Sequence, residues 1–276
     1  MCNAFKTIAV ASLMAMTLYS CGNDKQRETD AQALVEQASA LRERGDYGGA
    51  IALLDTLDTK YRDCRDQRRE ALRLRVETLM SMSADSLKGI EEQRPALVKS
   101  AESLAGDFVN VTMSGTEGYR VARAARTGNE MNVNTVQARI DENDYFYIIV
   151  NVIRPIGLNA VTFGKAVAKG TSLKMDGSEL MTLPQEACNA LAEAVAAAPA
   201  GSPVTFDVCG TRGNVKVKLN AHQAAAFRNT WAYANALQQI RLLNIRGEKY
   251  AQQIDALQTR LAAMESEAEP VADTEE

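Results

Sequence analysis

The feature that most constrains the fold is a heptad pattern near the C-terminal end of the chain. Apolar residues recur at alternating spacings of four and three from Ala236 to Met264, and no proline interrupts them. This pattern predicts a long helix with one apolar seam, as in a coiled coil. Asn220 is a suitable N-cap, so we expect the helix over residues 221–266. Gly247 occupies a seam position, where glycine weakens a helix by about 1 kcal/mol relative to alanine.

A second long helical pattern comes before the middle of the chain. Residues 63–110 carry apolar residues at similar spacing, and Pro95 lies among them, so we expect a kink or break there. The two patterned segments can close as an antiparallel pair, with residues 66–104 against 223–264. The alternative is that both helices fold back over the intervening region as a compact α+β domain.

The region between the helices, residues 116–220, has the composition of a small antiparallel β domain. Polar and apolar residues alternate over 132–140, and residues 145–153 are rich in aromatic and β-branched types. Further elements are expected as strands over 161–168 and 172–175, a hairpin over 203–219, and an alanine-rich helix over 183–198. The predicted fold class is α+β, with long antiparallel coiled-coil-like helices flanking this domain and a helical hairpin at the N-terminal side.

That N-terminal hairpin is predicted over residues 31–62. Leu34, Ala38 and Leu41 mark one apolar face, Gly45-Asp46-Tyr47 breaks the helix, and a second face follows. The pattern resembles the centre of one tetratricopeptide repeat, although Arg62 stands where the repeat has its closing proline. A single repeat cannot bury its own apolar face, so we expect the next helix to cap it. The resemblance implies a surface for a protein partner, whereas simple scaffold packing is the other interpretation.

The first twenty residues have the pattern of an export signal. Lys6 is the only charged residue before Cys21, and a short apolar run follows it from Ile8 to Met16. This run is too short for a membrane span, which needs about 20 apolar residues. Residues 1–20 are therefore expected to be a signal peptide.

Leu18-Tyr19-Ser20-Cys21 resembles the bacterial lipobox. The resemblance implies cleavage before Cys21, acylation of that cysteine with palmitate-type chains, and lasting attachment to a membrane. Gly22 stands where the inner-membrane retention signal has aspartate, so the outer membrane is expected, on its periplasmic or its surface face. The Ser-Cys-Gly junction also resembles lipoproteins of the Bacteroidetes. The alternative is an ordinary secretory signal with an incidental cysteine.

The segments that flank the folded part are polar. Residues 21–30 lack large apolar side chains and predict a flexible tether. Residues 267–276 predict an acidic, disordered tail.

Composition limits the function. The chain has 31 Lys and Arg against 35 Asp and Glu, and this mild acidity argues against a nucleic-acid partner. His222 is the only histidine and is expected at a helix start, so multi-histidine metal sites are excluded. We found no GxSxG, P-loop, HExxH or EF-hand pattern and predict no catalytic residue, cofactor or metal. Cys188 and Cys209 could form a disulfide, or they could be small buried apolar residues, like Cys64.

A few residues remain as candidate sites. Tyr145 and Tyr147 should share one face of a strand, where they could stack on a sugar; the alternative is sheet packing. Trp231 is expected to pack. The triplets around Thr56 and Ser86 resemble the O-glycosylation sequon of exported Bacteroidetes proteins, and Ser86 is expected near a helix turn.

Two functions are consistent with the sequence. The first is a non-enzymatic, lipid-anchored envelope scaffold or adaptor that binds a protein partner. The alternative is a surface-exposed lipoprotein that captures a glycan through the β domain, which requires a concave patch with Tyr145 or Tyr147 exposed. The seam over residues 250–264 could also pair between two chains and give a parallel homodimer.

Overall fold

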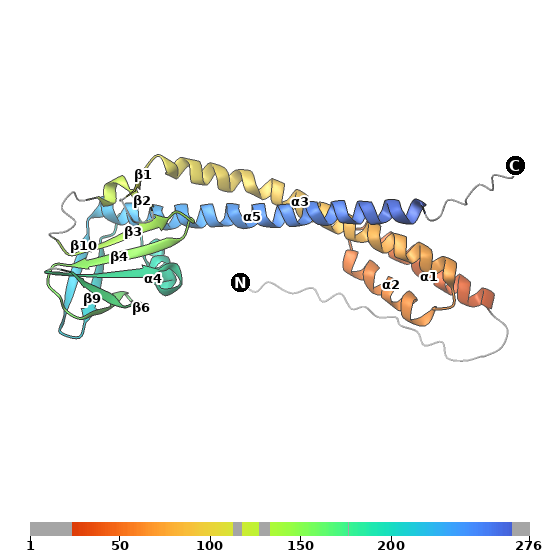
Figure 1. The fold of residues 1–276 in the computed structure, drawn as a ribbon, viewed down its shortest axis with the longest axis horizontal. Helices are drawn as coiled ribbons and strands as arrows, with labels where there is room; N and C mark the ends of the chain where they lie inside the picture. Colours follow the sequence, from red (N-terminus) through yellow and green to blue (C-terminus); the bar gives the residue numbers. More distant parts are fainter. Residues whose placement is uncertain (1–23, 113–117, 127–132, 176, 267–276) are drawn as a thin grey trace. The chain divides into compact units, whose positions relative to one another are not determined.

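The structure is a computed structural model that describes residues 24–112, 118–126, 133–175 and 177–266. The fold is α+β, as predicted, and the described residues form five α-helices and two antiparallel sheets (Figure 1). The chain divides into two compact units, residues 1–82 with 255–276, and residues 83–254. Helices α3 (Arg65–Ala105) and α5 (Ala221–Ser266) contribute to both units.

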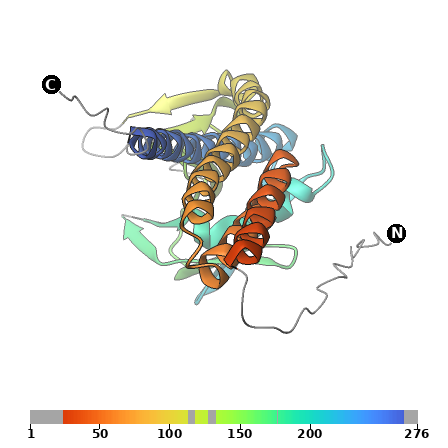
Figure 2. The ribbon, with the colours of Figure 1, turned by 90° about the vertical axis from the view of Figure 1, so that its right-hand side faces the viewer.

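The smaller unit contains the predicted hairpin. Helices α1 (Asp24–Glu43) and α2 (Tyr47–Lys60) pack together with the start of α3 (Figure 2). Asp46 caps α2 because its Oδ1 accepts the Gly49 N–H at 2.9 Å. Leu54 and Leu57 of α2 and Leu74 of α3 belong to one buried cluster. The third helix therefore supplies apolar surface that covers the two-helix hairpin, as we expected.

Helix α1 begins earlier than predicted. The expectation of a flexible tether over residues 21–30 is wrong from Asp24 onward. The reason is Arg27, whose Nη2 lies 2.6 Å from Asp63 Oδ1 and whose guanidinium lies 5.6 Å from the centre of the Tyr61 ring. These contacts fix the first turns of α1 to the end of α2. Cys21, the signal peptide predicted over residues 1–20 and the tail predicted over residues 267–276 lie outside the described residues.

Helix α3 is continuous, whereas the sequence predicted a kink or break within residues 63–110. It continues through Pro95, so the predicted break is not found. Ile90 and Ala101, on either side of Pro95, are both buried, and this packing keeps the segment helical. The turn expected near Ser86 is also wrong, because Ser86 lies in the helix interior.

Within the larger unit, α3 and α5 run antiparallel, as predicted. Gly247 of α5 lies opposite Leu87 and Ile90, and Phe108, which follows α3, packs on Tyr233 with ring centres 4.8 Å apart. In the smaller unit, Arg73 of α3 pairs with Glu265 of α5 at 2.9 Å.

The start of α5 is capped as expected. Asn220 Oδ1 accepts the Gln223 N–H at 2.9 Å, and Gln223 Oε1 accepts the Asn220 N–H at 3.0 Å. This reciprocal pair satisfies two helix N-terminal donors. His222 lies in the first turn, as predicted.

The six-stranded sheet has the order β1-β2-β3-β4-β8-β7. Its strands are β1 (Phe108–Val111), β2 (Tyr119–Ala122), β3 (Thr135–Asp141), β4 (Phe146–Val152), β7 (Ser172–Met175) and β8 (Ser178–Pro184). A 3-10 turn, η1 (Arg123–Ala125), follows β2. The sequence predicted β3, β4 and β7 but not β1, β2 or β8.

The four-stranded sheet has the order β10-β9-β5-β6. Its strands are β5 (Leu158–Phe163), β6 (Ala166–Lys169), β9 (Val204–Gly210) and β10 (Gly213–Leu219). The single strand predicted over 161–168 is in fact the β5–β6 hairpin, which turns at Gly164 with φ of 62°. The predicted β9–β10 hairpin is confirmed.

One core joins the two sheets. Phe227 of α5 lies between Phe146 of the six-stranded sheet, at 5.8 Å, and Phe206 of the four-stranded sheet, at 5.6 Å. Trp231 packs edge-on against Phe146 at 5.0 Å, so its expected packing role is confirmed. Helix α4 (Gln185–Ala197) adds Leu191 and Val195 to this core. The six-stranded sheet thus has an inner face turned to the core and an outer face turned away from it.

Candidate functional site

A cavity of about 490 Å³ lies on the outer face of the six-stranded sheet. Strands β2, β3, β4 and β8 and the start of α4 supply its walls. It is here called the tyrosine cavity, after three of its lining residues, Tyr119, Tyr145 and Tyr147, which Arg139 accompanies. The other lining residues are Gly118, Asp141, Phe146, Ile149, Thr182, Pro184 and Gln185.

Strand register brings these side chains together. Arg139 of β3 lies directly opposite Tyr147 of β4, and Tyr147 lies opposite Pro184 of β8. Side chains alternate along a strand, so Phe146 between the two tyrosines points inward and is fully buried. Tyr145 precedes β4 and is 51% exposed, while Tyr147 is half-buried. The shared face predicted for the two tyrosines is therefore confirmed.

Arg139 is held by neutral and aromatic groups. Its guanidinium carbon lies 4.0 Å from the centre of the Tyr119 ring, a cation–π arrangement. Its Nε donates to Gln137 Oε1 at 2.6 Å, and Gln137 Nε2 donates to the Ala125 carbonyl at 3.1 Å. The arginine is thus fixed in orientation before any ligand arrives.

Burial raises the pKa of the Tyr147 hydroxyl above its usual value, and the positive charge of Arg139 opposes this effect without cancelling it. Tyr147 is therefore neutral at physiological pH. A neutral tyrosine hydroxyl can both donate and accept a hydrogen bond, while its ring offers an apolar face.

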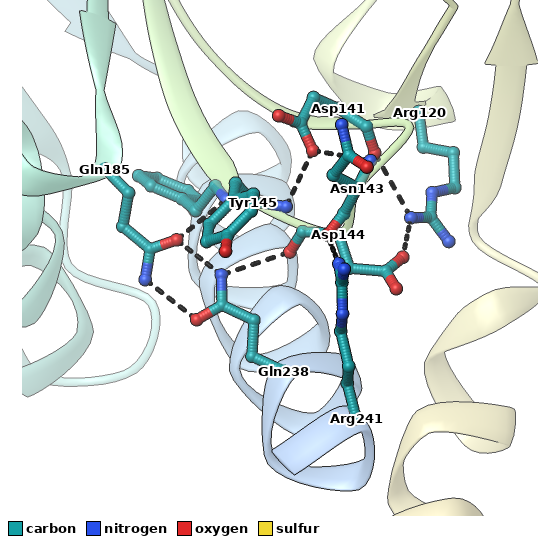
Figure 3. Close-up of polar contacts among 9 residues, drawn as sticks. Arg120, Asp141, Asn143, Asp144, Tyr145, Gln185, Gln238 and Arg241 are labelled. Atoms are coloured by element: carbon teal, nitrogen blue, oxygen red, sulfur yellow. Dashed lines mark hydrogen bonds and ion pairs between the residues drawn. The ribbon is translucent and has the colours of Figure 1, made fainter. Parts of the chain in front are cut away.

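The position of Tyr145 depends on the turn that precedes it (Figure 3). Asp141 Oδ1 accepts the N–H groups of Asn143 at 2.9 Å and Tyr145 at 2.8 Å. Asp144 has φ of 70°, a left-handed conformation that aspartate tolerates better than most residues, and it forms an ion pair with Arg120.

Helix α5 holds this turn from the other side (Figure 3). Gln238 Nε2 donates to the Asp144 carbonyl at 3.2 Å, and Arg241 Nη1 donates to the Asn143 carbonyl at 3.0 Å. Gln185, at the rim of the cavity, donates through Nε2 to Gln238 Oε1 at 3.0 Å. Gln185 Oε1 in turn accepts the Phe146 N–H at 3.2 Å. Hydrogen bonds therefore join three elements at this rim: the turn before β4, the start of α4, and α5.

Sequence reasoning missed four residues of this site. Arg139 had a signal, because its place in the alternation Val136, Ala138, Ile140 puts it on the outer face. No sequence pattern indicated the other three, because only the tertiary fold brings Tyr119, Gln185 and Gln238 close to Tyr145.

The other predicted residues do not line the cavity. Thr56 lies in α2, where its hydroxyl donates to the Ala52 carbonyl at 2.9 Å, and Ser86 lies in α3. Cys188 and Cys209 are not bridged to each other, and burial raises the pKa of the Cys188 thiol to about 12. Cys64 is also buried and is not in a disulfide.

None of the helices described is both long and apolar enough to cross a membrane. The part of the chain that the structure describes holds no cluster of three or more His, Cys, Asp or Glu suited to a metal ion.

Comparison with known proteins gave no match, whether with family models, curated proteins or solved structures.

Proposed function

We propose that the protein is a lipid-anchored envelope protein that captures a glycan in the tyrosine cavity. The observation that carries the proposal is the concave site on which Tyr145 is 51% exposed, with Tyr147 on the same wall. Binding sites are typically concave and mostly apolar, with a few polar groups that fix orientation.

The side chains of the cavity suit a ring-shaped, hydroxylated ligand. The tyrosine rings and Pro184 offer flat apolar surfaces for the faces of a sugar. The tyrosine hydroxyls and the Thr182 hydroxyl can bond to the sugar hydroxyls around its edge. The frame that Gln185 and Gln238 form reduces the ordering that binding requires.

The lipid anchor rests on the lipobox at Cys21. Only Gly22 and Asn23 separate that cysteine from α1, so acyl chains on Cys21 would hold the helical hairpin close to the membrane surface. Its test is metabolic labelling with an alkyne fatty acid, in which wild type is expected to be labelled and Cys21→Ala is not. Surface protease treatment of intact cells then distinguishes the surface face from the periplasmic face. A label of equal strength on both chains would overturn the anchor.

The test of ligand capture is a glycan array probed with the full chain carrying Cys21→Ser, which cannot be acylated. Tyr145→Ala should abolish the signals that this chain gives. Tyr250→Ala is the matched control, because Tyr250 lies on α5 away from the cavity. An array with no signal, or one in which the two variants behave alike, would refute the proposal.

A second function, an adaptor for a protein partner, is favoured by a separate observation. Leu242 and Ile245 of α5 are 52% and 55% exposed and lie one helical turn apart. Crosslinking in detergent extracts of the envelope should recover a partner with wild type and lose it with Leu242→Ser combined with Ile245→Ser. Recovery of the protein alone would leave this function without support.

A further inference from the structure

The outer face of the six-stranded sheet continues beyond the tyrosine cavity as a strip of aliphatic side chains. Leu180 of β8 is half-buried, and Leu173 and Met175 of β7 are 65% and 46% exposed. We call these three residues the aliphatic strip. Large apolar side chains gathered on one open surface indicate a binding surface.

Register places the strip on the same face as the cavity. Ile149 pairs with Thr182, and Asn151, two residues further along β4, pairs with Leu180. Leu180 pairs in turn with Leu173. Directly paired residues share a face, so the surface passes from Tyr147 through Ile149 to the strip without changing side.

Charged side chains of β7 and β8 are kept off this surface. Lys174 pairs with Glu179, and both lie at the alternate positions, on the opposite face. The outward positions of the two strands hold leucine, methionine, threonine, serine and proline. The outward positions of β7 and β8 therefore carry no charge, and they are apolar at Leu173, Met175 and Leu180.

The strip is firmly held although it lies at a sheet edge. Glu179 accepts the Ser172 hydroxyl at 2.6 Å and the N–H groups of Ile156 and Gly157, both at 2.9 Å. These bonds tie β7 to β8 and to the segment before β5. Leu173 is therefore exposed on an ordered strand, where it offers a fixed surface.

We propose that the ligand of this site is an amphiphile of the glycolipid class, with its sugar ring in the tyrosine cavity and its alkyl chain over Leu180, Leu173 and Met175. The inference rests on the proposed glycan capture and extends it. Leu173 lies two strands away from Tyr147 and four residues further along the strand direction. The distance between them is on the order of 15 Å, which a medium-length alkyl chain can span.

An alkyl chain fits this surface better than an added β-strand does. The edge strand β7 has four residues, and one of them is Lys174. Short edges that carry lysine are poor templates for strand pairing. An alkyl chain needs no backbone partner and buries the exposed methyl and methylene groups directly.

The experiment is a calorimetric titration of the full Cys21→Ser chain with maltose, hexyl maltoside, octyl maltoside and decanol, each below its aggregation concentration. Affinity is expected to rise about twofold per methylene. A methylene on an open sheet face loses roughly half of the water-accessible apolar area that it would lose in a closed core, and so contributes about half of the usual free energy. Leu173→Ser combined with Met175→Ser should remove this dependence and leave maltose binding unchanged. Val167→Ser is the matched control, since Val167 is a similarly exposed aliphatic residue, at 47%, on β6 of the other sheet.

The outcomes separate the two proposals. Maltose binding that does not grow with chain length, or that grows equally in the double variant, overturns the amphiphile and leaves glycan capture intact. Decanol binding that depends on the strip, without any effect of the sugar or of Tyr145→Ala, refutes glycan capture. A dimer in light scattering that becomes monomeric in the double variant would show that a second copy covers the strip, and this also overturns the proposal.

Discussion

Gln238 of α5 donates a hydrogen bond to the backbone carbonyl of Asp144, 94 residues earlier in the chain, at 3.2 Å. The bond joins the long C-terminal helix to the turn that presents Tyr145. The same Gln238 side chain pairs with Gln185 at the rim of the cavity. A residue that contacts no ligand thus positions the residue that should contact it.

Gln238→Ala should loosen this turn. The Asp144 carbonyl loses its partner, and the free energy of unfolding should fall by about 1–3 kcal/mol. Hydrogen exchange of the Phe146 N–H, which is bonded to Gln185, should become faster, and glycan affinity should drop severalfold. Gln252→Ala, an exposed glutamine on the same helix, is the control. Unchanged exchange in Gln238→Ala would contradict the positioning role.

Glu179→Gln should destabilise the protein at neutral pH and less so in acid. Burial by itself raises the pKa of Glu179, but hydrogen bonds from Ser172 and from backbone N–H groups outweigh it, so the pKa is lowered. A lowered pKa means that the carboxylate contributes stability at neutral pH, and that this contribution is lost as pH falls through the pKa of the folded state.

Urea unfolding at a series of pH values measures this effect. The variant should be less stable than wild type by about 2 kcal/mol at pH 7. The difference should shrink steadily as the pH falls. A constant difference across the series would show that the ionised carboxylate is not the stabilising species.

Gly247→Ala should stabilise the protein. A Cβ at this position would lie 3.7 Å from Leu87 Cδ1 and 3.8 Å from Ile90 Cγ2, which is ordinary contact. Alanine also favours a helix over glycine by about 1 kcal/mol. Gly89→Ala in α3, where a Cβ meets no atom within 4 Å, reports the helix effect alone. In thermal unfolding, the Tm of Gly247→Ala should be equal to or higher than that of Gly89→Ala. A Tm of Gly247→Ala below that of wild type would contradict the antiparallel packing.

Asn220→Ala should weaken the start of α5. The change removes the cap on the Gln223 N–H, which is worth about 0.5–2 kcal/mol. Gln223→Ala removes only the reciprocal bond and should have a smaller effect. Chemical denaturation of both variants measures the difference, and equal stability of Asn220→Ala and wild type would count against the cap.

The sequence predicted those helices and strands that bury one face and expose the other, because their apolar residues recur with a regular period. The alternation in β3 and the aromatic and β-branched residues of β4 predicted both strands, and the two-residue period of a strand predicted the shared face of Tyr145 and Tyr147. Strand β8 was missed because Glu179 is buried at an inward position, at 1% exposure, and breaks the apolar alternation. Glu179 can be buried because it accepts the N–H groups of Ile156 and Gly157, more than twenty residues earlier in the chain, and a local sequence pattern does not reveal such a contact.

The tyrosine cavity was predictable only in part. Tyr145 and Tyr147 stood out as alternating aromatics. Arg139 was missed, although the alternation of β3 contains the signal that would place it on their face. Tyr119 belongs to a four-residue strand that is too short to be recognised by period. Gln185 and Gln238 lie on helices, where a glutamine indicates solvent until the fold brings the two side chains together.

The place of Phe227 between the two sheets has a consequence for the order of folding. Phe146 and Phe206 both pack against a residue that comes after every strand in the chain. The strands can pair early, but their shared core stays incomplete until residue 227 is available. Contacts of such long sequence separation slow folding. During synthesis, α4 can cover part of this core, but the apolar surface around Phe146 and Phe206 stays exposed until Phe227 is available.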